Sequence, residues 1–134
     1  MTATDDIGKL VLRVSVGALI LLHGISKLQN GIDGIIGMLG SLGLPPFLAY
    51  GVYFGEVVGP LLVIIGLFTR IGALLIVGNM LAAFGLAHTQ ELFSLGQMGG
   101  WALELQGMFL FGSIAILLLG AGRFSAGGFN GKFN

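Results

Sequence analysis

Long apolar stretches alternate with short polar breaks along this chain, which is the pattern of helices that lie in lipid. A helix needs about 20 mostly apolar residues to cross a hydrocarbon core about 30 Å thick. Four stretches meet this length, and we predict helices over about residues 7–28, 47–68, 71–88 and 101–120. Helices are expected because lipid offers the backbone no hydrogen-bond partner, and the short alternating segments of a membrane barrel are missing. The pattern predicts one all-α membrane domain over residues 1–134, an antiparallel bundle of four transmembrane helices.

The breaks between the predicted helices contain turn residues. Pro45 and Pro46 open the second helix, since proline is tolerated in a first helical turn. Thr69 and Arg70 leave so short a connection that the second and third helices must be antiparallel neighbours. The tail from Arg123 is rich in glycine, asparagine and serine, and we expect it to be poorly ordered.

The stretch over about residues 32–42 is too short to span a membrane. Its apolar residues recur at helical spacing, which favours a short amphipathic helix lying in the membrane interface between helices one and two. These residues are Ile32, Ile35, Ile36, Leu39 and Leu42. A floppy loop is the alternative, because the intervening glycines weaken any helix.

Composition agrees with lipid as the solvent. Charged residues make up 9% of the chain and hydrophobic residues 55%, whereas a soluble domain carries roughly 25% charged residues. The formal net charge is zero, so no basic surface is available to attract nucleic acid. The chain has no cysteine, which excludes disulfides, iron–sulfur clusters and thiolate zinc sites carried by this chain alone.

The distribution of basic residues predicts orientation. With four crossings both ends lie on one side, and five of the six basic residues fall there while only Lys27 falls on the other. The positive-inside rule then places both termini in the cytoplasm. Asp5 and Asp6 precede the first apolar stretch, where a cleavable signal would be basic, so we expect this helix to be retained.

Ionisable residues inside a membrane cost about 2.5–3.5 kcal/mol each on insertion scales, so each of them needs a partner. In the first helix, Arg13, His23 and Lys27 fall within an arc of roughly 80° at 100° per residue. We predict that Glu56 and Glu104 face this stripe, and that a polar residue of the third helix joins by hydrogen bonding. The candidate catalytic residues are Glu56, Glu104 and His23, and the candidate cofactor-binding residues are His23, Lys27, Glu56, Asn79 and Glu104.

Simpler interpretations of these residues stay open. Buried charge pairs can serve only to hold four helices in register, and Arg13 could extend to the headgroups. His23 and His88 are the only pair of candidate haem ligands, and haem, like a metal held by histidine and glutamate, is disfavoured because His88 is expected at the surface. Gly51, Gly55 and Gly59 form a ridge that indicates close helix packing beside Glu56.

Three blocks of sequence follow one another in a distinctive order. They are Leu22-His23-Gly24-Ile25-Ser26-Lys27-Leu28, then Gly55-Glu56-Val57-Val58-Gly59-Pro60 with Gly66-Leu67-Phe68-Thr69-Arg70, and finally residues 100–105 continuing to 120–125. Together these blocks resemble the DoxX family of bacterial inner-membrane four-helix proteins. The family is related to the small membrane subunit of thiosulfate:quinone oxidoreductases. The resemblance implies an inner-membrane location and gives Lys27, Glu56, Arg70 and Glu104 as family-like polar positions.

Three functions follow as hypotheses. The first is a subunit of a membrane oxidoreductase in which a quinone headgroup lies at the polar cluster, with a soluble or membrane redox partner. The second is a scaffold or assembly factor without chemistry. The third is a small-solute transporter, for which a membrane-buried carboxylate is a common ingredient and which would need a homo-oligomer.

Overall fold

The computed structural model describes residues 2–128 and 130–134, which form helices and connecting turns. The main helices are α1 (Ala3–Asn30), α2 (Asp33–Ser41), α5 (Thr69–Leu86) and α6 (Glu104–Leu119). A composite helix lies between α2 and α5, and consists of η1 (Pro46–Tyr50), α3 (Gly51–Tyr53), η2 (Phe54–Val58) and α4 (Gly59–Ile65). A short turn of helix, η3 (Thr89–Glu91), follows α5. The prediction of an all-α protein is confirmed for these residues.

Three helical segments are long and apolar enough to cross a membrane, namely Ala3–Asn30, Pro46–Ile65 and Thr69–Leu86. The apolar helix α6 is shorter, at 16 residues. It starts three residues after the predicted position, because Trp101 belongs to the preceding loop and donates from its indole nitrogen to the Leu92 carbonyl oxygen, 2.8 Å away. The helices together define a membrane protein.

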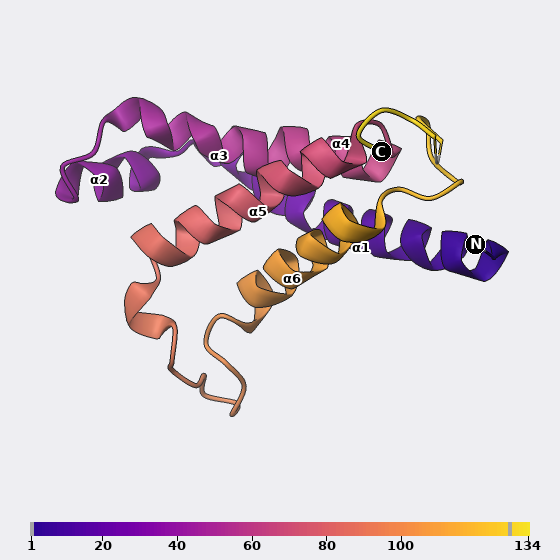
Figure 1. Cartoon of the computed structure of the whole chain (residues 1–134). Helices are drawn as coiled ribbons and strands as arrows, with labels where there is room; N and C mark the ends of the chain where they lie inside the picture. Colours follow the sequence, from indigo (N-terminus) through magenta and orange to yellow (C-terminus); the bar gives the residue numbers. More distant parts are fainter. Residues whose placement is uncertain (1, 129) are drawn as a thin grey trace.

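The predicted short helix after α1 is present as α2. Its Leu39 is buried and packs with Ile32 and with Ala49 of η1 in a small apolar cluster. This cluster fastens α2 against the start of the composite helix. Figure 1 shows these two segments side by side.

Four helices share the main apolar core. Ile20 of α1, Val63 of α4, Ile76 of α5 and Ile116 of α6 are each fully buried in it. In Figure 1 the composite helix lies along α1, and α5 and α6 run obliquely across them. The most extensive contacts join α5 to α6 and α4 to α5 and α1.

The predicted glycine ridge brings the composite helix close to α5. A Cβ at Gly59 would lie 2.9 Å from the Gly72 carbonyl oxygen, and a Cβ at Gly55 would collide with the side chain of Asn79. Gly51 does not take part, because a Cβ there would meet no atom within 4 Å. Two of the three glycines therefore serve the packing that the pattern indicates.

Two arginines bind the carboxyl ends of helices. The fully buried Arg13 donates to the carbonyl oxygens of Val63 and Ile64 at 2.8 and 3.2 Å, in the last turn of α4. Arg70 donates in the same way to Leu117 and Leu118 in the last turn of α6. A guanidinium at this position satisfies carbonyls that have no partner within the helix and is favoured by the helix dipole.

The tail after α6 is folded back over this end of the molecule, so the expectation of poor order is wrong for its described residues. Asn134 is buried, and its side-chain oxygen accepts from the backbone N–H and the hydroxyl of Thr69 at 3.1 and 2.7 Å. Arg123 pairs with the buried Asp6 of α1, with Nε 3.4 Å from Oδ2. The polar residues that suggested disorder instead bond to the starts of α1 and α5.

Replacing Arg13 by alanine should destabilise the protein strongly. The change removes three charge-assisted hydrogen bonds in the interior, including one of 2.6 Å to the Phe124 carbonyl oxygen. We expect a loss of about 3 kcal/mol or more in the free energy of unfolding, measured by denaturation in detergent. The matched control is R123A, since Arg123 is 56% exposed and its ion pair should contribute less than about 1 kcal/mol. Equal losses for the two variants would contradict the capping role of Arg13.

Candidate functional site

Glu56 is the centre of a polar cluster formed by three helices. Its side chain is 8% exposed. The ammonium group of Lys27 in α1 donates to Oε1 at 2.5 Å, and the amide nitrogen of Asn79 in α5 donates to Oε2 at 3.2 Å. A buried carboxylate is stable when its charge is paired and both oxygens are hydrogen-bonded, and here both oxygens have a donor.

The local backbone places Glu56 at this depth. It lies in η2, a turn of π-helix in which the Gly59 N–H donates to the Phe54 carbonyl oxygen, five residues earlier. Turns of this kind occur mostly as single-turn bulges inside α-helices and are frequent at functional sites. The close approach of α1 depends on Gly24, where a Cβ would collide with the Glu56 carbonyl oxygen.

A cavity of about 800 Å³ opens beside the cluster, between α2, the composite helix and α5. Most of its wall is apolar and comes from residues such as Ile35, Met38, Leu48, Leu74 and Leu86. Its polar groups include Lys27, Glu56, Asn79 and His88. The cavity is therefore apolar over most of its wall and polar around the Glu56 carboxylate.

A second, smaller cavity of about 140 Å³ lies on the other side of the same cluster. It shares Lys27, Glu56, Asn79 and His88 with the large cavity and adds His23 of α1 and Gln106 of α6. The His23 ring packs edge-on against Phe109, with 5.6 Å between ring centroids. The carboxylate of Glu56 is thus reached from an apolar side and from a side lined by two imidazoles and an amide.

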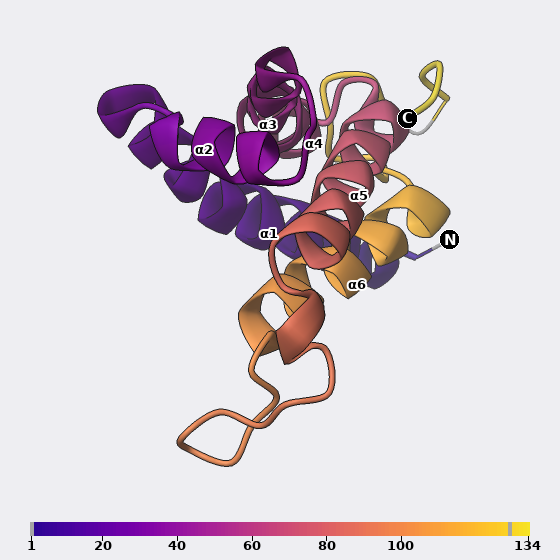
Figure 2. The same cartoon turned by 90° about the vertical axis from the view of Figure 1, so that its left-hand side faces the viewer.

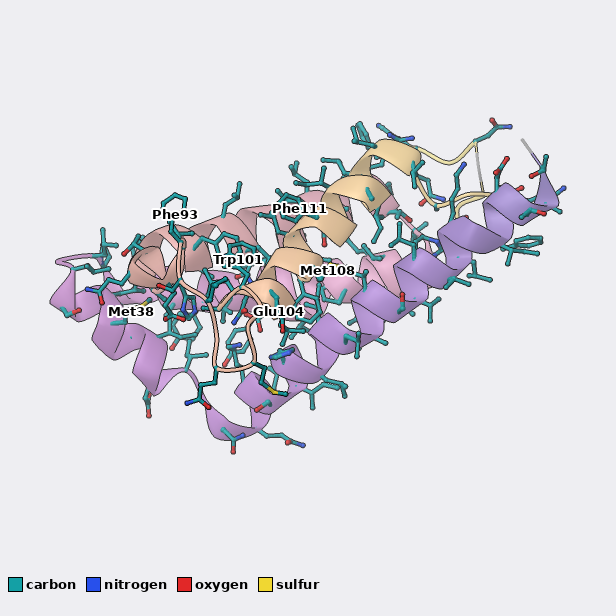
Figure 3. All side chains as sticks on the ribbon, turned by 90° about the horizontal axis from the view of Figure 1, so that it is seen from below. Met38, Phe93, Trp101, Glu104, Met108 and Phe111 are labelled. Atoms are coloured by element: carbon teal, nitrogen blue, oxygen red, sulfur yellow. The ribbon has the colours of Figure 1, made fainter. Side chains whose placement is uncertain are left out.

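Glu104 does not join the cluster, and the prediction that it faces His23 and Lys27 is wrong. It is exposed, lines neither cavity, and places its carboxylate close to Gly100. Figure 3 shows Glu104 at the start of α6. The reason is that α6 begins at Glu104 itself, so this carboxylate lies in the first turn, where the helix dipole favours negative charge.

Arg13 also lies away from the cluster, although it shares the polar stripe of α1 with His23 and Lys27. Ten residues separate it from His23, which is a rise of about 15 Å along the helix. It therefore reaches the carboxyl end of α4 instead of a carboxylate, and it is buried rather than extended to the headgroups.

Gln106 was not identified as a site residue from the sequence. His88 was expected at the surface, whereas it lies in the wall of both cavities. Glu104 and Gln106 are about 200° apart on a helical wheel, so only one of them can face the other helices. Charge pointed to Glu104, whereas the helix packing turns Gln106 inward. The signal for the correct choice is Ser113, a polar residue within the apolar helix that is fully buried and lies about 20° from Gln106 but about 180° from Glu104 on the wheel.

The fold and this cluster define the chain as a helical membrane protein with a buried, paired carboxylate beside an apolar cavity. Comparison with protein families gives a match to the DoxX model over residues 8–89, which covers the chain from α1 to the end of α5. The chain belongs to the DoxX family, as its sequence blocks indicate.

Two relatives extend the comparison. The chain is 37% identical over 126 residues to the Bacillus subtilis protein named "Putative oxidoreductase CatD", covering 94% of this chain and 88% of the relative. It is 33% identical over 104 residues to a Haemophilus influenzae protein described as uncharacterized, covering 75% and 76% of the two chains. No solved structure matches the chain.

The ion pair of Lys27 and Glu56 should show strong energetic coupling. K27M leaves a buried carboxylate without its cation, and E56Q leaves an ammonium without its anion, so each single variant should lose about 2–4 kcal/mol of stability. The double variant K27M/E56Q should be more stable than the sum of the single losses by about 1.5 kcal/mol or more, measured in a double-mutant cycle by unfolding in detergent.

The exposed pair of His88 and Glu91, with 3.2 Å between Nδ1 and Oε1, is the control for this cycle. H88Q and E91Q should couple by less than about 1 kcal/mol. Additive losses at Lys27 and Glu56 would show that the pair does not stabilise the cluster.

Proposed function

We propose that this protein is the membrane subunit of an oxidoreductase and that it binds a quinone at the Glu56 cluster. The observation that carries the proposal is the cavity of about 800 Å³, which is apolar along most of its wall and polar around Lys27, Glu56 and Asn79. A quinone has the matching form, with a polar ring at one end and a long apolar tail at the other.

The proposed setting is the bacterial inner membrane. There, α1, the composite helix, α5 and α6 cross as four antiparallel helices, α2 lies in the interface, and both termini are cytoplasmic. The ion pair of Asp6 with Arg123 supports this topology because it ties the start of α1 to the tail after α6. The excess of basic residues at that end supports its cytoplasmic orientation.

The residues present fit a quinone headgroup. Pockets for small molecules measure about 300–1,000 Å³ and are mainly apolar with a few placed polar groups, as this cavity is. An ammonium has three N–H donors, and Lys27 uses one of them on Glu56. The others are available to a carbonyl oxygen of the ring, while the apolar wall takes the tail.

The chain's own residues would bind the ring and manage its protons. A quinone, when bound, would accept two electrons and two protons. Lys27 holds one end of the ring by hydrogen bonding, and Glu56 exchanges a proton at the carboxylate that Lys27 and Asn79 orient. The small cavity with His23 and Gln106 gives that carboxylate a polar route on the side away from the tail.

Electrons would come from a redox partner protein, soluble or in the membrane. The relative from Bacillus subtilis bears the name of an oxidoreductase, which supports a role in an electron-transfer reaction. A homo-oligomer in the membrane is compatible with the many apolar side chains exposed on the helices.

Filling the large cavity should abolish quinone binding. Gly78 of α5 lines the cavity, and a Cβ there meets no atom within 4 Å, so we expect the side chain of G78L to extend into the cavity. Gly85 lies two turns further along α5, also has no atom within 4 Å, and does not line the cavity, so G85L is the matched control. We expect saturable quenching of the single tryptophan, Trp101, by decylubiquinone in the wild type and in G85L, and at least tenfold weaker binding in G78L.

Absence of saturable binding in the wild type would overturn the quinone proposal and favour a scaffold without chemistry. Equal binding by G78L and G85L would place the quinone outside this cavity.

Replacing Glu56 by glutamine should separate binding from proton exchange. E56Q keeps the shape and an oxygen for Asn79 but cannot release a proton, so quinone affinity should change less than quinone reduction by membranes. Single-residue general acid–base contributions amount to about 10²–10⁴-fold, and we expect a loss in this range. Full quinone-dependent activity in E56Q membranes would contradict the role of Glu56.

A further inference from the structure

The segment from Leu92 to Leu103 forms a hairpin that carries large apolar side chains in the open. We call residues 92–103 the apolar hairpin. Phe93 is 99% exposed, Leu95 74% and Met98 100%. The chain has no aspartate, glutamate, lysine or arginine between Glu91 and Glu104. Figure 2 shows this loop projecting from the body of the molecule beyond α5 and α6, and Figure 3 shows Phe93 pointing outward.

The backbone of the apolar hairpin is bonded to itself. The Gly96 N–H donates to the Gly100 carbonyl oxygen at 2.6 Å, and the Ala102 N–H donates to the Ser94 carbonyl oxygen at 2.9 Å. The indole of Trp101 donates to the Leu92 carbonyl oxygen at 2.8 Å. Non-helical backbone near lipid is tolerated where its polar groups find partners within the protein, and these bonds supply partners for part of the hairpin backbone.

Trp101 fastens the hairpin to the two helices that it connects. Its ring packs edge-on against Phe84 of α5, with 6.0 Å between ring centroids, and lies directly against Gly107 of α6. The hairpin is therefore a structured extension of these helices. The exposed apolar side chains project from a backbone that Trp101 and the hydrogen bonds fix to α5 and α6.

The length of the helices indicates what covers these side chains. At 1.5 Å per residue, the 16 residues of α6 rise about 24 Å, which is shorter than a hydrocarbon core of about 30 Å. The apolar hairpin leads directly into the start of α6, so its side chains lie where the crossing by α6 is still incomplete.

We infer that the apolar hairpin inserts Phe93, Leu95 and Met98 into the lipid at the membrane boundary on the side opposite the chain ends. Lipid fits better than an aqueous position because the segment is uncharged and exposes three large apolar side chains. This inference uses the four-helix arrangement proposed above but does not depend on the quinone site.

The test uses the absence of native cysteine, which makes single-cysteine labelling free of background. F93C and M98C replace side chains that are almost wholly exposed, so neither change disturbs packing. Each variant carries a nitroxide label and is placed in vesicles of phosphatidylethanolamine and phosphatidylglycerol. Power saturation then compares collisions with oxygen, which enters lipid, and with a water-soluble nickel chelate.

Two further labels calibrate the depth. F111C lies on α6, where Phe111 is 60% exposed, and should report lipid. Q90C lies in η3 next to the hairpin, is exposed and polar, and should report water. We expect the labels at positions 93 and 98 to report lipid, as position 111 does, but at a shallower depth of about 5–10 Å below the headgroups.

Labels at 93 and 98 that collide with the nickel chelate as position 90 does would overturn the inference. Labels protected from both reagents would overturn it too, because the hairpin would then be covered by protein, such as a second copy of the chain. A label at position 111 that reports water would contradict the proposed four-helix arrangement, and the inference, which uses that arrangement, would fail with it.

Discussion

Polar groups inside a membrane must find their partners within the protein, because lipid supplies none, and this constraint organises the whole structure. Glu56 is the clearest case. Its carboxylate is held by Lys27 of α1 and Asn79 of α5, so one buried charge connects the composite helix to both neighbours. If the three helices separated, each of these polar groups would enter lipid alone.

At the opposite end of the molecule, buried polar groups also find partners within the protein, but there arginine side chains donate to main-chain carbonyls. Arg13 and Arg70 each satisfy the last carbonyls of a helix that follows later in the chain. The tail then closes over this end through Asn134 and Arg123. One end of the fold is therefore sealed by arginines and main-chain carbonyls, while the other end keeps a carboxylate beside open space. Both cavities described above lie beside the Glu56 cluster, at the end that the arginines do not close.

The site depends on backbone approach as much as on charge. Gly24 and Gly55 allow α1 and α5 to come against the π-helical turn that contains Glu56. Because the helices touch closely beside Glu56, the wall of the large cavity is formed by side chains of α2 and by other positions on α5. A rigid, paired carboxylate between an apolar and a polar cavity is the feature that makes this part of the molecule suitable for proton-linked chemistry.

The helical class, the membrane setting, the short helix α2 and the meeting of Lys27, Glu56 and Asn79 could all be predicted from the amino-acid sequence. They follow from length, periodicity and the cost of unpaired charge in lipid, all of which are local or pairwise properties. The outward position of Glu104, the inward position of Gln106, the binding of a helix end by Arg13 and the ordered tail could not be predicted, and became visible only in the folded chain. Each of these depends on the rotation, depth and ends of packed helices, and a shift of one or two residues in a helix start reverses which side chain faces the neighbours.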